Sequence, residues 1–220
     1  MLTITVGDPA IPWTHLNPQS DSKRVVLHQG GSQRVIGTTE EIIEWIEFGG
    51  KPALWRTQTL ETDLWPSRTG ITVVERATFA PLAHREHSGE QIVSIEYSGT
   101  VVRGSRQLPS GQGVPIQAVL PGPAFEMHSV EMILRLLPLG EGFAARLPAY
   151  SAHREGLFWV ALRATGQERV DAGGDRAVDA WVVEVDFGPT RQTYWVGGEP
   201  PALLRQSSLL EDGVVLAFVR

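Results

Sequence analysis

Short apolar runs alternate with polar residues along most of the chain, and glycine and proline separate the runs. Most runs carry β-branched or aromatic residues, which are typical of strands. The clearest series lies between residues 70 and 121 and consists of ITVVERAT, LAHREHS, QIVSIEYSG, TVVRGSRQL and VPIQAVLPG. Because side chains alternate between the faces of a strand, each of these runs can bury one face. The pattern predicts an antiparallel meander of five strands.

Strands are also expected on both sides of this meander. The runs before it are LTITV, KRVVLHQ, QRVIGTTEEIIEWIEF and KPALWRTQTLETDLW, with a loop rich in Pro, Asn, Asp and Ser at residues 7–22. The apolar residues of the third run also fit a helical period, so a helix and a strand are both possible there. The Gly49-Gly50 pair that follows the run favours strands. The runs after it are GFAARLPAYS, LFWVALRATG, ERVD, AVDAWVVEVDF, RQTYWVGG, ALLRQSSLL and GVVLAFVR.

One segment, PAFEMHSVEMILRLLPLG, departs from the two-residue period and predicts a helix. Its apolar residues at helical spacing are Phe125, Met132, Ile133, Leu136 and Leu137. Pro138 and Gly140 are expected to end it. Such a helix must bury its apolar stripe, and a sheet offers the only large apolar surface. We therefore predict a mainly β protein, with residues 1–220 as a single domain: one curved antiparallel sheet or half-open barrel with this amphipathic helix packed on its concave face.

Composition and charge narrow the class of partner. The chain has 220 residues, of which 42% are hydrophobic and 20% charged, as in ordinary globular proteins. Its formal net charge is −6, and no basic run offers a footprint for nucleic acid. Cysteine is absent, so disulfides and thiolate ligands are excluded. We expect no transmembrane segment. The start MLTITVGDP lacks a leader, which indicates the cytoplasm if Met1 is the native start and the periplasm if a leader has been removed.

The same Ala-His-Arg-Glu run occurs twice, in LAHREH and in SAHREG. If both runs are strands, His84 shares a face with Glu86, and His153 shares a face with Glu155. On neighbouring strands, these four side chains would offer two imidazoles and two carboxylates, enough for a zinc or iron site. The alternative is that they belong to the polar face of a half-exposed sheet. We favour that alternative and predict no metal.

Other signs of chemistry are weak. On the predicted helix, His128 and Glu131 face the same way, at a spacing that suits a metal or an imidazole oriented by its carboxylate, but equally a helix surface. No Gly-x-Ser-x-Gly motif occurs, and the glycine-rich turns lack the features of a phosphate loop. We expect no cofactor.

Tryptophan is frequent, with seven residues in the chain. Five fall inside predicted strands: Trp45, Trp55, Trp159, Trp181 and Trp195. Several indoles on one concave face can line a cavity for an apolar ligand with a polar end. The alternative is that they are core residues.

A family resemblance adds to this picture. The helix end ILRLLPL, the strands FWVALRATGQERV and DAWVVEVDF, the finish TYWVGGEPPALLRQSSLLEDGVVLAFVR and the upstream VERATFAPLAHREHSG resemble the bacterial domain-of-unknown-function family 3108. The resemblance covers residues 52–220. It implies a long curved antiparallel sheet wrapped over a helix, in exported proteins similar to the lipoprotein carriers of the periplasm. It implies no catalytic residues.

These observations together predict a non-catalytic binding or carrier protein for a hydrophobic small molecule or lipid in the bacterial cell envelope. Apolar ligand surface would be buried against the tryptophans and the helix. A first alternative is a metal-dependent or cofactor-free hydrolase, isomerase or lyase that uses His and Glu in the cavity. A second alternative is a structural or assembly protein that binds a partner chain.

Overall fold

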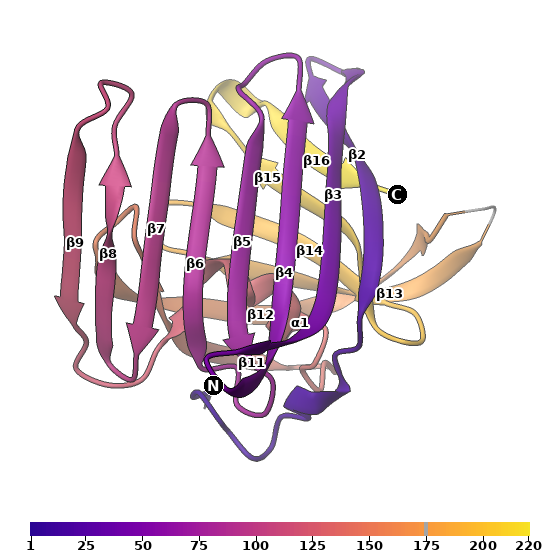
Figure 1. The fold of residues 1–220 in the computed structure, drawn as a ribbon. Helices are drawn as coiled ribbons and strands as arrows, with labels where there is room; N and C mark the ends of the chain where they lie inside the picture. Colours follow the sequence, from indigo (N-terminus) through magenta and orange to yellow (C-terminus); the bar gives the residue numbers. More distant parts are fainter. Residues whose placement is uncertain (174–175) are drawn as a thin grey trace.

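One long antiparallel sheet dominates the computed structural model, which describes residues 1–173 and 176–220 (Figure 1). In these residues the strands are β1 (Leu2–Thr3), β2 (Gln19–Gln29), β3 (Ser32–Phe48), β4 (Lys51–Thr62), β5 (Arg68–Glu75), β6 (Pro81–Ser88), β7 (Gln91–Ser98), β8 (Val101–Gln107), β9 (Gly113–Val119), β10 (Phe125–Glu126), β11 (Ala144–Ser151), β12 (Gly156–Asp171), β13 (Ala177–Asp186), β14 (Arg191–Gly197), β15 (Ala202–Leu209) and β16 (Val215–Val219). Their order across the sheet is β1, β11 to β16, then β2 to β9, and β10 pairs with β11.

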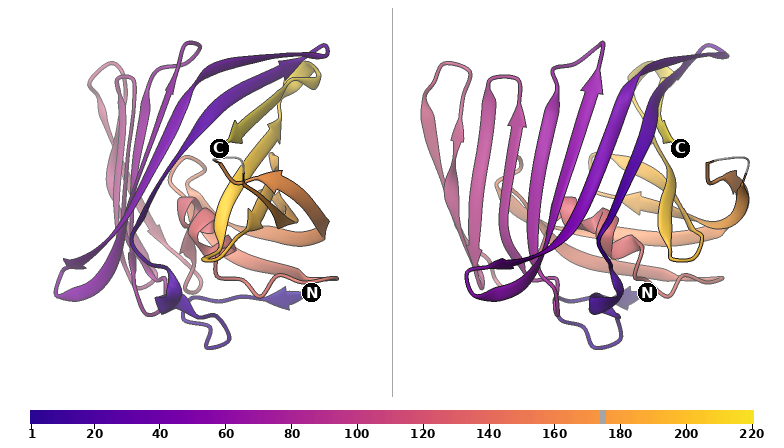
Figure 2. Two further views of the ribbon diagram at one scale, coloured as in Figure 1. Left: turned by 90° about the vertical axis from the view of Figure 1, so that its right-hand side faces the viewer. Right: turned by 45° about the vertical axis from the view of Figure 1, so that its right-hand side comes forward.

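The sheet has two halves that face each other. We call β2 to β9 the N-terminal half and β11 to β16 the C-terminal half. They join where β16 pairs antiparallel with β2. Beyond this join the two halves lie opposite one another with the helix between them, and the sheet is not closed (Figure 2). The predicted curved sheet with a helix on its concave face is therefore confirmed.

The helix is shorter than the sequence predicted. A 3-10 turn, η2 (Met127–Ser129), leads into α1 (Val130–Leu134). Phe125 and Glu126 form β10 instead, because their backbone pairs parallel with β11. Two further 3-10 turns are η1 (Trp13–His15) and η3 (Glu211–Gly213). The predicted apolar stripe is nevertheless buried, so the periodicity identified the right side chains and the wrong length.

One apolar core joins the two halves through the helix. Members from the N-terminal half are Ile43, Leu54 and Val74, and members from the C-terminal half are Leu147, Val160, Val183, Val185 and Leu203. The helix contributes Val130, Met132, Ile133 and Leu134, all essentially inaccessible to solvent. Burial of this kind contributes about 1.5–3 kcal/mol for each large side chain. The helix therefore holds the two halves at a fixed spacing.

The predicted strands agree well with the structure. Residues 32–48 form one strand rather than a helix, and β5 to β9 form the predicted meander of five strands. LFWVALRATG and ERVD are one continuous strand, β12, with a bulge between Ala164 and Gly166. The loop predicted at residues 7–22 ends earlier, because β2 begins at Gln19. Among the described residues, no helix has the length and apolar character needed to cross a membrane.

Candidate functional site

The first His-Arg-Glu run lies on β6 and has the predicted alternation. His84 and Glu86 are buried on the inner face, whereas Arg85 and His87 are exposed on the outer face. A buried imidazole and a buried carboxylate on one strand need polar partners, because an unpaired ionisable group is costly to bury. The partners come from the neighbouring strand β5, from residues 126–128 before the helix and from the turn after β11.

The second run is not a strand, which corrects the sequence prediction. Residues 152–155 form the turn between β11 and β12, and Glu155 has a positive φ of 50°. In this turn His153 and Glu155 do not share a face. Glu155 Oε1 lies 3.3 Å from the guanidinium of Arg106, whereas His153 Nε2 lies 3.1 Å from the buried carboxylate of Glu86. His153 therefore belongs to the site that the structure brings together, and Glu155 does not.

Three side chains from three different parts of the fold meet in the interior. His153 Nε2 lies 3.1 Å from Glu86 Oε1, and His128 Nε2 lies 3.7 Å from Glu86 Oε2. One ligand atom from each residue lies within 4.8 Å of the other two. We call Glu86, His128 and His153 the Glu-His-His triad. Two imidazoles and one carboxylate at this spacing can share a proton or hold a metal ion.

A third histidine, His84, packs against His128 of the triad. The rings of His84 and His128 stack in parallel, with centroids 4.6 Å apart and an interplanar angle of 3°. His84 Nδ1 is 3.1 Å from Thr72 Oγ1 and 3.9 Å from Glu126 Oε2. The backbone N–H of His128 donates to the carboxylate of Glu126 at 2.6 Å. These contacts hold the His128 ring in place, in the 3-10 turn that leads into the helix.

Burial controls the charge of these groups. It lowers the pKa of His84 to about 4, and it lowers the pKa of His128 well below its usual value. Burial also raises the pKa of Glu126 to about 8. For Glu86 burial acts to raise the pKa, but the hydrogen bond from His153 and the charge of Arg68 outweigh it and lower the pKa. At neutral pH the buried histidines are therefore uncharged and Glu86 is ionised.

Two triad members open onto a hollow of about 310 Å³ between the two halves of the sheet. We call this hollow the interior cleft. Its lining residues are Gln58, Arg68, Met127, His128, Val130, Glu131, Ser151, His153, Arg154, Phe187, Thr190, Gln192, Tyr194 and Gln206. Most of these side chains are polar, and they come from both halves and from the helix. A small molecule in the cleft would meet hydrogen-bonding groups from both halves, together with the apolar side chains of Met127, Val130 and Phe187.

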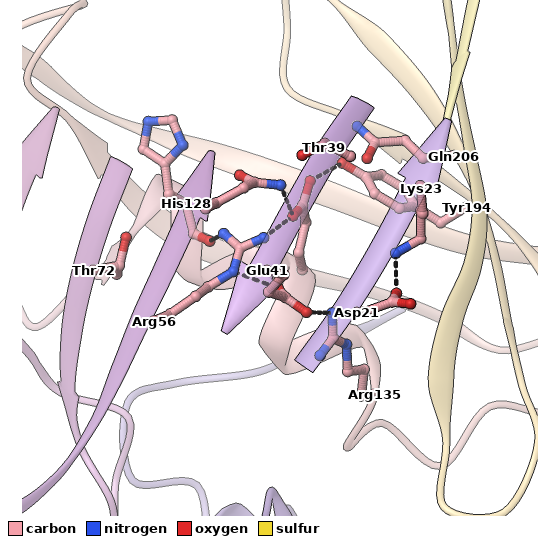
Figure 3. Close-up of polar contacts among 12 residues, drawn as sticks. Asp21, Lys23, Thr39, Glu41, Arg56, Thr72, His128, Arg135, Tyr194 and Gln206 are labelled. Carbon is pink, nitrogen blue, oxygen red and sulfur yellow. Dashed lines mark hydrogen bonds and ion pairs between the residues drawn. The ribbon is translucent and has the colours of Figure 1, made fainter. Parts of the chain in front are cut away.

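A buried network of ion pairs lies beside the interior cleft (Figure 3). Arg56 Nε donates to Glu41 Oε1 at 2.5 Å, and the guanidinium also pairs with Glu131. The other oxygen of Glu41 pairs with Arg135. Arg56 also donates to the backbone carbonyl of His128 at 3.0 Å. The network therefore ties the helix to β3 and β4 and holds the backbone of a triad residue.

Opposite charges keep this network ionised. Burial acts to raise the pKa of Glu41, but Arg135 and Arg56 outweigh it and lower the pKa to about 2. Burial acts to lower the pKa of Arg56, and Glu41 and Glu131 reverse that effect and raise it. Glu41, Arg56 and Arg135 were not predicted from the sequence. Strand parity could have identified the first two, since Glu41 shares a face with buried Ile43, and Arg56 with buried Leu54.

His128 and Glu131, which the sequence placed on one face of a helix, have different partners in the structure. Glu131 accepts from Gln58 at 3.3 Å and from the Tyr194 hydroxyl at 3.4 Å, in addition to Arg56. His128 faces Glu86 and His84 instead. The reason is that His128 lies in the 3-10 turn, so the helical spacing assumed for the two residues does not apply.

The five tryptophans lie in strands, as predicted, but they are dispersed. Trp45 and Trp159 are about half exposed, with the guanidinium groups of Arg76 and Arg146 over their rings. Trp195 is buried in a separate cluster with Ala180, Val182 and Leu204, and its Nε1 donates to Glu168 at 2.8 Å. Trp181 packs against the main core, and Trp55 Nε1 donates to Thr57 at 3.0 Å. The indoles therefore do not line one common cavity.

Comparison with known families confirms the resemblance found in the sequence. The chain matches the family described as Protein of unknown function (DUF3108) over residues 33–210, which is most of its length. No curated protein and no solved structure matches the chain. The chain belongs to the DUF3108 family.

Proposed function

We propose that this member of the DUF3108 family is a ligand-binding protein that takes a small polar molecule into the interior cleft. The observation that carries the proposal is the cleft itself, a hollow of about 310 Å³ between the two halves of the sheet, with a polar lining. Its volume is at the lower end of the range of roughly 300–1,000 Å³ that is common for small-molecule sites.

The chemistry of the lining indicates the kind of ligand. Gln192 Oε1 accepts from Tyr194 and, at 3.1 Å, from Gln206, so these side chains form a connected polar surface. Arg68 and Arg154 supply positive charge on the N-terminal and C-terminal sides of the cleft. Glu131 is already paired with Arg56. A ligand that accepts hydrogen bonds and carries negative charge fits this surface better than a lipid tail does.

A hydrophobic ligand, which the sequence led us to expect, is the second candidate, and a separate hollow favours it. This hollow has a volume of about 510 Å³ and lies on the C-terminal half. Its apolar lining residues are Met1, Ala144, Ala161, Leu162, Val185, Leu209 and Val215. The bacterial cell envelope remains the expected setting for either ligand, on the family resemblance alone.

The test is a thermal-shift screen with two sets of compounds, small polar metabolites and fatty acids. Thr190→Trp narrows the mouth of the cleft, because Thr190 is exposed in the turn before β14 and lines the cleft. Thr14→Trp makes the same change at an exposed position of η1. We expect polar compounds to stabilise the native chain and Thr14→Trp, and to lose their effect on Thr190→Trp. Stabilisation by fatty acids alone, equal in both variants, would favour the second candidate instead.

A further inference from the structure

The Glu-His-His triad contains buried polar atoms that could still bind a further group. Glu86 Oε2 and His128 Nε2 are inaccessible to solvent, and neither has a hydrogen-bond partner. They face each other across 3.7 Å, which is too long for a hydrogen bond. Buried polar atoms are rarely left in this state, because each gives up its hydration without a replacement. Two such atoms that face each other indicate a missing partner between them.

The spacing of the triad fits a metal ion as that partner. A tetrahedral ion with bonds of about 2.1 Å holds its ligand atoms about 3.4 Å apart. In the triad, His153 Nε2 lies 3.1 Å from Glu86 Oε1, and His128 Nε2 lies 3.7 Å from Glu86 Oε2. The ligand atoms of the triad are therefore close to the spacing that one such ion requires.

We propose that Glu86, His128 and His153 bind one divalent transition-metal ion of the zinc or ferrous-iron class, with an open coordination position that faces the interior cleft. Two imidazoles and one carboxylate are the mixed nitrogen and oxygen set that such ions prefer. The open position follows from the lining of the cleft, which includes both His128 and His153. The ion would adjoin the proposed ligand, but its binding needs no ligand in the cleft and can be tested without one.

The supporting residues favour a preformed site. His128 is held by its stacking on His84, by its backbone bond to Glu126 and by the bond from Arg56 to its carbonyl. Glu86 is held on β6, between β5 and β7. His153 is the most accessible of the three, with a side chain 37% exposed on a turn. Glu86 and His128 are therefore held in place before an ion binds, and His153 completes the ligand set from the side of the cleft.

Arg68 is the group that competes with the ion. Its Nε lies 3.7 Å from Glu86 Oε2, and its side chain is 40% exposed. A bound cation would replace this weak pairing, and Arg68 has room to turn toward solvent. A second group, His84, Glu126 and His128, also has ligand atoms within 4.8 Å of one another. It is less suitable because only His128 of this group lines the cleft, whereas both histidines of the triad do.

Zinc titration of the full chain tests the proposal. Tag-free protein is stripped with a chelator and titrated with Zn²⁺ by calorimetry, and Co²⁺ is then added to record the visible absorption of the bound ion. We expect one equivalent of Zn²⁺ to bind. Loss of an outer-sphere partner typically weakens metal binding 10–100-fold, so His153→Gln, which removes a ligand, is expected to weaken it by roughly 100-fold or more.

His87→Gln is the matched control, because His87 is exposed on the outer face of the same strand as Glu86. We expect its affinity for Zn²⁺ to stay within a factor of about three of the native chain. Glu86→Gln should behave as His153→Gln does. If this buried substitution prevents folding, the exposed turn position of His153 keeps the test valid.

Three results would overturn the proposal: no stoichiometric binding to the native chain, unchanged affinity in His153→Gln, or equal losses in His153→Gln and His87→Gln. Loss of binding in His84→Gln, with none in His153→Gln, would move the ion to the enclosed group and overturn it as well. None of these results bears on ligand binding in the screen with Thr190→Trp, so the two proposals fail separately.

Discussion

His153 and Glu86 come from opposite halves of the sheet, and their side chains meet at 3.1 Å in the interior. Each belongs to one of the two repeated His-Arg-Glu runs, so the runs do contribute to one site, through the histidine of one and the glutamate of the other. The contact depends on the fold of the whole chain, because β6 and the turn after β11 are brought together only when both halves close on the helix.

Loss of the Arg56 guanidinium should destabilise the fold strongly. In Arg56→Met, Glu41 and Glu131 would keep their negative charges in the interior without their shared partner. Breaking a buried pair in this way typically costs about 3–5 kcal/mol. Urea unfolding followed by circular dichroism measures the change. Arg163→Met is the control, since its pair with Glu184 is exposed and should contribute less than about 1 kcal/mol.

Acid should weaken the same network. The pKa of Glu41 is lowered to about 2 in the folded chain, from an ordinary value of 4.5. Its contribution to stability is therefore complete above pH 4.5 and is lost as the pH falls toward 2, by on the order of 3 kcal/mol. We expect the free energy of unfolding of the native chain to fall steeply in this window. A Glu41→Gln variant should be less stable at pH 7 and should show a shallower fall, and equal slopes would contradict the assignment.

The helix should stabilise the fold through burial between the two halves. Ile133 is inaccessible to solvent, whereas Ile42 on the outer face of β3 is 44% exposed. Ile133→Ala should lower the free energy of unfolding by about 2–5 kcal/mol, because it removes transfer energy and leaves a cavity. Ile42→Ala should cost much less. Similar losses in the two variants, measured by chemical denaturation, would show that the helix is not enclosed between the halves.

The exposed tryptophans should be dispensable for binding in the cleft. Trp159 lies on the outer side of β12, beneath the guanidinium of Arg146, and does not line the cleft. Trp159→Ala should therefore leave the thermal shift by any cleft ligand unchanged, although it removes a large aromatic side chain. The same measurement on Thr190→Trp gives the contrast. Loss of binding in Trp159→Ala would revive the tryptophan-lined cavity suggested by the sequence.

Much of the fold was predictable from the sequence because the two-residue alternation is local. It identified β3 to β9, and it placed His84 and Glu86 together on one buried face. The helix length and the turn at residues 152–155 were not predictable in this way. Phe125 leaves the helix because its backbone pairs with β11, and His153 lies in a turn although its sequence resembles that of β6. Both outcomes depend on contacts between distant segments.

The buried ion-pair network had a local signal that was not used. Glu41 and Arg56 are charged residues at positions where strand parity predicts apolar side chains, beside Ile43 and Leu54. Charged residues at core positions of adjacent strands are expected to pair with each other. Their extension to Arg135 and Glu131 required the position of the helix, which the sequence did not supply.

Anomalous diffraction would locate an ion bound to the Glu-His-His triad. Crystals of the full chain would be grown with equimolar Zn²⁺, and data would be collected on both sides of the zinc absorption edge. We expect one anomalous peak at the inner face of β6, about 2.0–2.2 Å from ligand atoms of Glu86, His128 and His153. A peak only at exposed histidines such as His87, or no peak in crystals whose cleft is open to solvent, would contradict the metal site.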